Sequence, residues 1–110
     1  MKKFVDAYDG LKLAFKHKAF LIQVVLGILA IIGGIIIKLD EYEWLAFAIC
    51  ICMVLMCEIL NTAIEKIGDY LNSEYDEKIK NIKDLSAAAV LISSIGALVI
   101  CLICVIRRIL

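Results

Sequence analysis

The stretch Glu58-Ile-Leu-Asn-Thr-Ala-Ile-Glu65-Lys-Ile-Gly-Asp69 decides how the rest of the chain is interpreted. It continues an apolar run that begins near Trp44. A helix advances about 100° per residue, so the polar residues of this stretch fall within roughly one third of its circumference. They form what we call the polar ladder: Glu58, Asn61, Thr62, Glu65 and Asp69. The sequence therefore predicts a polar ladder along one side of an otherwise apolar helix.

Glu58 lies deep in this helix. It follows the start of the apolar run by about 14 residues, and at about 1.5 Å per residue this places it well inside the hydrocarbon of a bilayer. An ionisable side chain there costs at least about 2.5 kcal/mol, so it indicates a functional site by default. The alternative is that Glu58, Asn61 and Glu65 only join helices through hydrogen bonds.

Two carboxylates of the ladder suit different chemical roles. Glu58 and Glu65 are about 10 Å apart along a helix axis, too far to share one ion readily. The deeper Glu58 suits a general base towards a hydroxyl, and the shallower Glu65 suits a magnesium ligand. Lys83 could neutralise the charge of a phosphate during transfer.

The composition is that of a membrane protein. The chain has 110 residues, of which 64% are hydrophobic, and its mean hydropathy is +0.96. A soluble chain of this size could not bury so much apolar surface. No basic face exists, which excludes a nucleic-acid-binding protein. The five cysteines all lie in apolar runs, where they are expected to act as small buried hydrophobes.

Hydrophobic patterning predicts an all-α protein, a single integral-membrane domain over residues 1–110. An amphipathic interfacial helix is expected over about residues 2–17, because large apolar residues recur there at helical spacing among lysines. Three membrane-spanning helices are expected over about residues 19–38, 44–71 and 84–106, with a charged connector over residues 72–83. A stripe of small residues on the last helix suits tight helix contacts: Ser86, Ala89, Ser93 and Ala97, with Gly96 alongside.

Lysine and arginine placement predicts the orientation in a cell membrane. Nine of the twelve basic residues precede the first spanning helix or lie at or after the end of the second. Only Lys38, Arg107 and Arg108 belong to the other side. The positive-inside rule then places the amino terminus and the long connector in the cytoplasm.

The polar ladder also carries a resemblance. Glu58-Ile-Leu-Asn61-Thr-Ala-Ile-Glu65 followed by Asp69 resembles the signature of the prokaryotic diacylglycerol kinase family, which includes the undecaprenol kinases. The likeness extends to Lys83-Asp84 and to the pair Glu43-Trp44, and it covers roughly residues 43–100.

The resemblance implies an integral-membrane homotrimer with composite active sites. Such an enzyme transfers the γ-phosphate of ATP to a lipid hydroxyl, of diacylglycerol or undecaprenol, with Mg²⁺. It implies that Glu58 is the general base and that Asn61 and Glu65 line the metal–phosphate site. Asp69, Lys83 and Asp84 would lie at the nucleotide.

The amino-terminal part departs from the family pattern. The family glutamate that helps Glu65 bind metal has no counterpart, because His17 or Lys18 stands in its place, and the usual arginine and histidine become Leu21 and Gln23. A lysine in place of a carboxylate opposes a divalent cation beside it. Two hypotheses follow: a magnesium-dependent lipid kinase, or a catalytically impaired relative that acts as a small oligomeric membrane protein.

Overall fold

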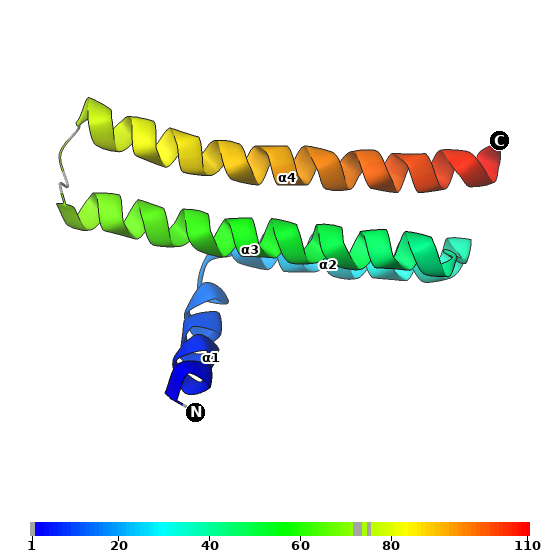
Figure 1. Ribbon diagram of the computed structural model, residues 1–110, viewed down its shortest axis with the longest axis horizontal. Helices are drawn as coiled ribbons and strands as arrows, with labels where there is room; N and C mark the ends of the chain where they lie inside the picture. The colour runs from blue at the N-terminus through cyan, green and yellow to red at the C-terminus, as the bar shows by residue number, and fades with distance from the viewer. Residues whose placement is uncertain (1, 72–73, 75) are drawn as a thin grey trace.

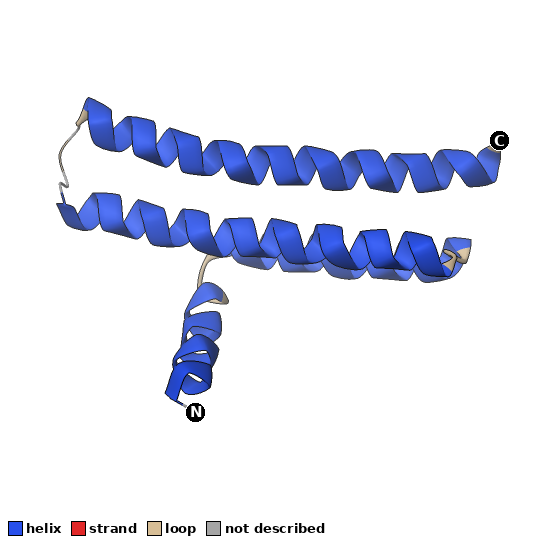
Figure 2. Ribbon diagram, in the orientation of Figure 1, coloured by secondary structure: helices blue, strands red, loops and turns tan. Residues whose placement is uncertain are grey.

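The computed structural model describes residues 2–71, 74 and 76–110, and these residues form helices only (Figure 2). In chain order the helices are α1 (Lys2–Ala14), α2 (Lys18–Ile37), α3 (Glu41–Leu71) and α4 (Glu77–Ile109). Figure 1 shows α2, α3 and α4 extending lengthwise beside one another, while α1 points away from them. The predicted all-α class is confirmed.

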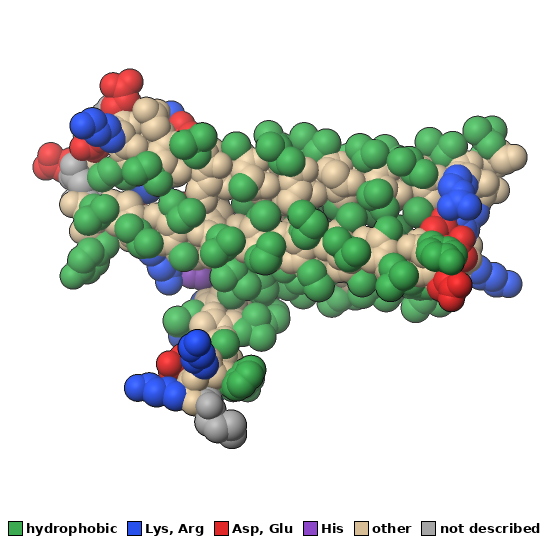
Figure 3. Space-filling view, viewed as in Figure 1, with side chains coloured by type: hydrophobic (Ala, Val, Ile, Leu, Met, Phe, Trp, Pro, Cys, Tyr) green, Lys and Arg blue, Asp and Glu red, His purple; other side chains and the backbone are tan. Residues whose placement is uncertain are grey.

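Three of the helices, α2, α3 and α4, are long and apolar enough to cross a membrane. Their large apolar side chains are mostly exposed in the single chain; Ile36 on α2, for example, is 72% exposed. Figure 3 shows apolar side chains covering the middle of these helices and charged side chains gathered at their two ends. Hydrocarbon or another protein surface must therefore cover the middle of the bundle.

The helices begin and end close to the predicted residues, with one large difference. Helix α4 begins at Glu77, although the sequence interpretation placed residues 77–83 in the connector and began the helix at residue 84. The cause is Asp76, whose carboxylate accepts hydrogen bonds from the backbone N–H groups of Lys78 (2.8 Å) and Ile79 (3.3 Å). These bonds satisfy two of the otherwise unpaired N–H groups of the first turn. Residues 72, 73 and 75 of the predicted connector lie outside the described residues.

The other helix ends differ by three residues or fewer. Helix α1 ends at Ala14 rather than residue 17, and α2 covers residues 18–37 rather than 19–38. Helix α3 begins at Glu41 rather than residue 44 and ends at Leu71 as predicted, while α4 continues to Ile109 rather than residue 106.

A tight turn joins α2 to α3. Lys38 adopts a left-handed conformation with φ of 59°, and the N–H of Leu39 donates to the carbonyl of Gly34 at 3.1 Å. Gly34 is needed here, because a Cβ on it would lie 2.7 Å from Leu39 Cδ1 and 2.8 Å from Trp44 Cη2. We call this end of the bundle, where α4 also finishes, the turn end, and the opposite end the connector end.

A network that we call the clasp closes the turn end. It consists of Asp40, Glu43 and Arg108. Asp40 and Glu43 exchange backbone-to-carboxylate hydrogen bonds of 2.9 and 3.0 Å, a capping box at the start of α3. The Arg108 guanidinium pairs with Glu43, which is 4% exposed, and also donates to the carbonyls of Ile37 and Lys38. The end of α4 is thereby joined to the α2–α3 turn.

Just inside the clasp lies a small apolar cluster of Leu39, Phe47 and Cys104. Helix α3 packs chiefly against α4 and less extensively against α2, whereas α2 and α4 barely touch. The three long helices therefore leave a space between them along α3, and the cluster fills it only at the turn end.

The small-residue stripe on α4 divides between two faces. Ser86, Ser93 and Ala97 are half-buried. Ala89 is exposed, and a Cβ on Gly96 would meet nothing within 4 Å. Ala89 and Gly96 thus form a second, outward-facing small-residue surface.

Candidate active site

The polar ladder runs from the interior of the bundle to its connector end. Glu58 is 5% exposed, Asn61 and Thr62 are half-buried, and Glu65 and Asp69 are exposed. Exposure therefore increases along the ladder from Glu58 towards the connector end. Along α3, the buried carboxylate of Glu58 is followed towards the connector end by the exposed carboxylates of Glu65 and Asp69.

The Glu58 carboxylate faces α2. The side-chain amide of Gln23 donates a long hydrogen bond of 3.4 Å to Glu58 Oε1. Thr62 does not contact this carboxylate, because its hydroxyl donates instead to the backbone carbonyl of Glu58 at 2.9 Å. A bond of 3.4 Å lies beyond the usual range and is weak, so Glu58 remains able to accept a stronger bond.

Asn61 and Glu65 form the next step of the ladder. The Asn61 amide donates to Glu65 Oε1 at 2.7 Å. The Asn61 carbonyl oxygen, Oδ1, is buried and has no hydrogen-bond partner within the part of the chain that the structure describes. A buried acceptor without a partner is costly, and in native proteins it often indicates an ion, a water or a ligand.

These oxygen atoms fit a magnesium ion. Mg²⁺ in proteins usually takes one or two carboxylates, and it completes its coordination with waters and substrate phosphates. Glu65 and the unpaired Asn61 Oδ1 supply oxygen ligands of that kind, one helical turn apart. The described residues contain no group of three or more His, Cys, Asp or Glu that could hold a metal. Phosphates, waters or a second chain would therefore supply the remaining ligands.

Asp69 and Lys83 join α3 to α4 at the connector end through an ion pair. Gly68, which is buried, lies beneath the lysine stem. A Cβ there would approach Lys83 Cε at 2.9 Å and Ile79 Cγ2 at 3.0 Å. The absent side chain lets the stem of Lys83 cross α3 and reach the carboxylate.

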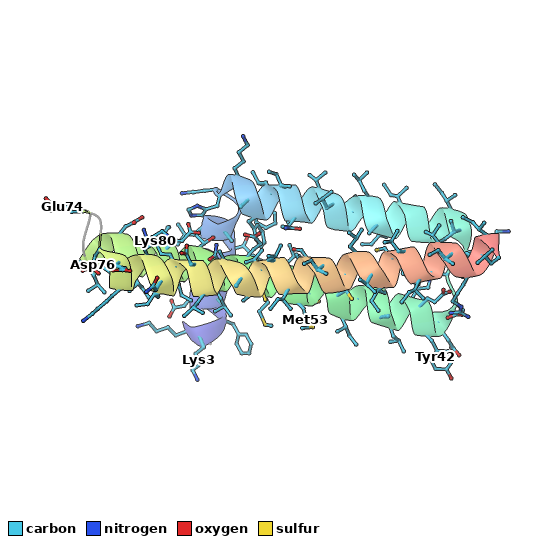
Figure 4. The ribbon with its side chains drawn as sticks, turned by 90° about the horizontal axis from the view of Figure 1, so that it is seen from above. Lys3, Tyr42, Met53, Glu74, Asp76 and Lys80 are labelled. Atoms are coloured by element: carbon cyan, nitrogen blue, oxygen red, sulfur yellow. The ribbon has the colours of Figure 1, made fainter. Side chains whose placement is uncertain are left out.

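Asp84 pairs with Lys80 one turn before it on α4, at 2.6 Å. Figure 4 shows Asp76 and Lys80 at the connector end, far from Tyr42 at the turn end. The predicted site residues thus belong to two parts. One is the polar ladder on α3, and the other is Lys83 and Asp84 near the start of α4, which the Lys83–Asp69 ion pair connects to the ladder.

His17 and Lys18, one of which replaces the metal-binding glutamate of the family, lie where α2 begins. His17 is half-buried and precedes α2 with an extended backbone, and its side chain makes no capping hydrogen bond. Lys18 is the first residue of α2 and is exposed. Neither belongs to a metal-binding group in the described chain.

A cavity of about 310 Å³ lies between α2, α3 and α4. Its wall is almost wholly apolar; Gln23 and Ser94 are its polar residues other than cysteine. Ser94 Oγ is buried and lacks a hydrogen-bond partner among the described residues. Eleven residues separate Asp69 from Glu58 and Lys83 from Ser94, so the antiparallel pairing of α3 with α4 places Ser94 level with Glu58.

Sequence reasoning missed the parts of this site that depend on contacts between helices. In the sequence, Gln23 stands out only as the replacement of a family histidine, whereas the structure places it in contact with Glu58. No pattern in the sequence distinguishes Ser94 from the other small residues of its helix. The spacing Asp40-x-x-Glu43 is a capping-box pattern that could have extended α3 to Glu41.

The family model and relatives that match this chain are described as diacylglycerol kinases. Residues 5–105 match the family model described as prokaryotic diacylglycerol kinase. A diacylglycerol kinase of Escherichia coli is 33% identical over 84% of this chain and 77% of its own length. One from Helicobacter pylori is 32% identical over 79% of this chain and 69% of its own length.

A diacylglycerol kinase of Synechocystis sp. is 32% identical over 88% of this chain. The match spans 57% of that relative's length.

Proposed function

Because the chain belongs to the prokaryotic diacylglycerol kinase family and is a multi-pass membrane protein, we propose that it is an ATP-dependent lipid kinase. It would transfer the γ-phosphate of ATP to a lipid hydroxyl. The observation that carries this proposal is the buried Glu58 carboxylate within an apolar helix, in line with two carboxylates that solvent can reach.

Glu58 acts as the general base. The lipid hydroxyl loses its proton to the Glu58 carboxylate while its oxygen forms a bond to the γ-phosphorus. The bond from that phosphorus to the β–γ bridging oxygen breaks, and ADP leaves. The weak Gln23 contact supports this role, because it orients the carboxylate without occupying it fully.

The connector end receives the nucleotide. Asn61 and Glu65 would hold Mg²⁺, which supplies charge neutralisation on the phosphates when bound. Lys83 releases Asp69 and donates to a phosphate oxygen, where its charge is available to the transition state. Asp84 holds Lys80 beside this site through their ion pair.

The acceptor is a membrane lipid with one free hydroxyl, either diacylglycerol or undecaprenol. The name of the relatives favours the first. The pair Glu43-Trp44 resembles the polyprenol-using branch of the family and favours the second. The kinase is a homotrimer of the cell membrane with its amino terminus in the cytoplasm, where ATP is present; the placement of nine basic residues supports that orientation.

A second candidate is a catalytically impaired relative that acts as an oligomeric membrane protein. Lys18 and His17 favour it, because one of them stands where the family has a metal-binding glutamate. A cation at that place would oppose Mg²⁺.

Phosphate transfer distinguishes the two candidates. The purified chain in nanodiscs is given labelled ATP and Mg²⁺ with either diacylglycerol or undecaprenol, and the lipid fraction is analysed for label. A kinase gives labelled lipid phosphate with at least one acceptor, and chelation of Mg²⁺ abolishes it. If neither lipid is labelled while the oligomer is intact, the impaired relative is the correct assignment.

A further inference from the structure

The cavity between α2, α3 and α4 has a polar end and an apolar end. Gln23 and Ser94 lie at the level of Glu58, and the Gln23 amide contacts the Glu58 carboxylate directly. From there the wall continues towards the turn end through Gly27, Val54 and Ala97. The polarity of this space is that of a lipid whose hydroxyl lies near Glu58 and whose chain extends away from it.

The apolar end of the cavity adjoins a packed apolar cluster. Phe47 and Ala30 line the cavity there and also belong to the packed cluster with Leu39 and Cys104. Phe47 is 5% exposed and contacts Trp44 edge to face, with ring centroids 6.1 Å apart. The clasp fastens α4 to α3 beyond this cluster, so the floor is held in place.

We propose that this cavity receives the hydrocarbon chain of the acceptor lipid, and that Phe47 and Ala30, as its floor, determine how long a chain fits. The proposal rests on the proposed kinase function. The span from the level of Phe47 to that of Glu58 is about 16 Å of helix, long enough for much of an acyl chain. Ser94 can donate to an oxygen near the lipid hydroxyl, which would satisfy its buried, unpaired Oγ.

Photolabelling tests occupancy without requiring turnover. A diacylglycerol with a diazirine near the end of one acyl chain is photolysed with the wild-type chain in nanodiscs without ATP, and adducts are located by mass spectrometry. We expect adducts at Phe47, Ala30 and Cys101 rather than at Ile49, which is 60% exposed and does not line the cavity. Excess unlabelled dioleoylglycerol or undecaprenol should remove these adducts, and the effective competitor identifies an acyl or a prenyl chain.

Two outcomes of photolabelling would overturn the proposal. Adducts confined to exposed residues such as Ile49, with no competition, would mean that the lipid only surrounds the bundle. Cross-links that place a second copy of the chain against Ala97 and Cys101 would mean that protein fills the cavity. Adducts at the floor without any kinase activity would retain the cavity assignment and reject the kinase function instead.

Floor variants test chain length. Ala30→Leu shortens the cavity and should lower kcat/KM for dioleoylglycerol or undecaprenol about tenfold, while dioctanoylglycerol or farnesol loses much less. Phe47→Ala should shift the preference towards longer chains. Ala48→Leu is the control, because Ala48 is exposed on the same helix and does not line the cavity. If Ala30→Leu keeps the wild-type oligomeric state but loses kcat/KM equally for long and short acceptors, Ala30 is not part of a floor that limits chain length.

Discussion

Asn61 and Glu65 are joined by a hydrogen bond, but one oxygen of the pair has no partner within the described chain. The Asn61 amide holds the Glu65 carboxylate at 2.7 Å, yet its own Oδ1 is buried without a partner in the described structure. A buried acceptor without a partner costs about 1–3 kcal/mol, so a group that satisfies this oxygen would stabilise the site. An ion held between the two residues would do so and would stabilise both.

Glu65→Gln should raise the Mg²⁺ concentration that gives half-maximal lipid phosphorylation by about tenfold or more, because it removes a charged oxygen ligand. The measurement is a Mg²⁺ titration of the transfer rate at saturating ATP. Glu41→Gln is the matched control, since Glu41 is an exposed glutamate of the same helix at the turn end. An unchanged Mg²⁺ requirement in Glu65→Gln would remove Glu65 from the metal site.

At the residue scale the sequence identified the ladder on α3 and, on α4, Lys83 and Asp84, but it did not identify Gln23 or Ser94 as neighbours of Glu58. The ladder follows from helical periodicity alone, so Glu58 and Glu65 were identified as candidates without a structure. Gln23 and Ser94 lie on other helices, and their approach to Glu58 depends on the register between helices. That register results from packing between helices, of which the Asp69–Lys83 pair is one contact, and no single-helix pattern encodes it.

Among the helices, α4 depends on one capping residue at the connector end. Asp76→Ala removes two hydrogen bonds to the first turn and should destabilise it by about 1 kcal/mol. Residues up to Lys83 would then fray more readily, so we expect the KM for ATP to rise and the KM for lipid to change little. Asn81→Ala, an exposed change in the same segment, should leave both constants near their wild-type values. A KM for ATP that is equal in both variants would contradict the role of the cap.

The clasp should fasten the other end of α4. Arg108→Leu leaves the buried Glu43 carboxylate without its main partner and should lower the thermal unfolding midpoint in detergent. Arg107→Leu is the control, because Arg107 is 61% exposed and reaches Glu43 only at 3.4 Å. Similar midpoints for the two variants would show that the clasp contributes nothing to stability.

The extents of the helices were predictable where apolar residues define them. A run of charged residues such as 77–83 fits either a connector or the exposed start of a helix, so the sequence pattern does not distinguish the two. In the structure the Asp76 cap starts α4 at Glu77, and these residues are helical. The clasp joins residues 65 positions apart, Glu43 and Arg108, and such a contact could not be derived from local pattern.

For the whole molecule, the exposed apolar faces of α2, α3 and α4 require a covering. All three helices are long and apolar enough to cross a membrane, whose hydrocarbon would cover such faces. The homotrimer stays a prediction, and the outward-facing Ala89 and Gly96 offer the close approach that helix contacts between chains need.

Ala89→Leu should therefore weaken self-association, because a larger side chain holds a neighbouring helix away. Chemical cross-linking in mild detergent should show trimers in the wild type and fewer in the variant. Ala88→Leu, an adjacent exposed alanine about 100° around the helix, is the control. Equal trimer yields in all three proteins would exclude this face as the contact.

The central claim is that the buried carboxylate of Glu58 removes the proton from a lipid hydroxyl during phosphate transfer. The most direct measurement is the single-turnover rate of transfer from bound ATP to lipid in wild type and Glu58→Gln. We predict that the rate falls about 10²- to 10⁴-fold, while ATP binding and the thermal unfolding midpoint stay close to wild type. A Glu58→Gln variant that transfers phosphate at the wild-type rate would contradict the account.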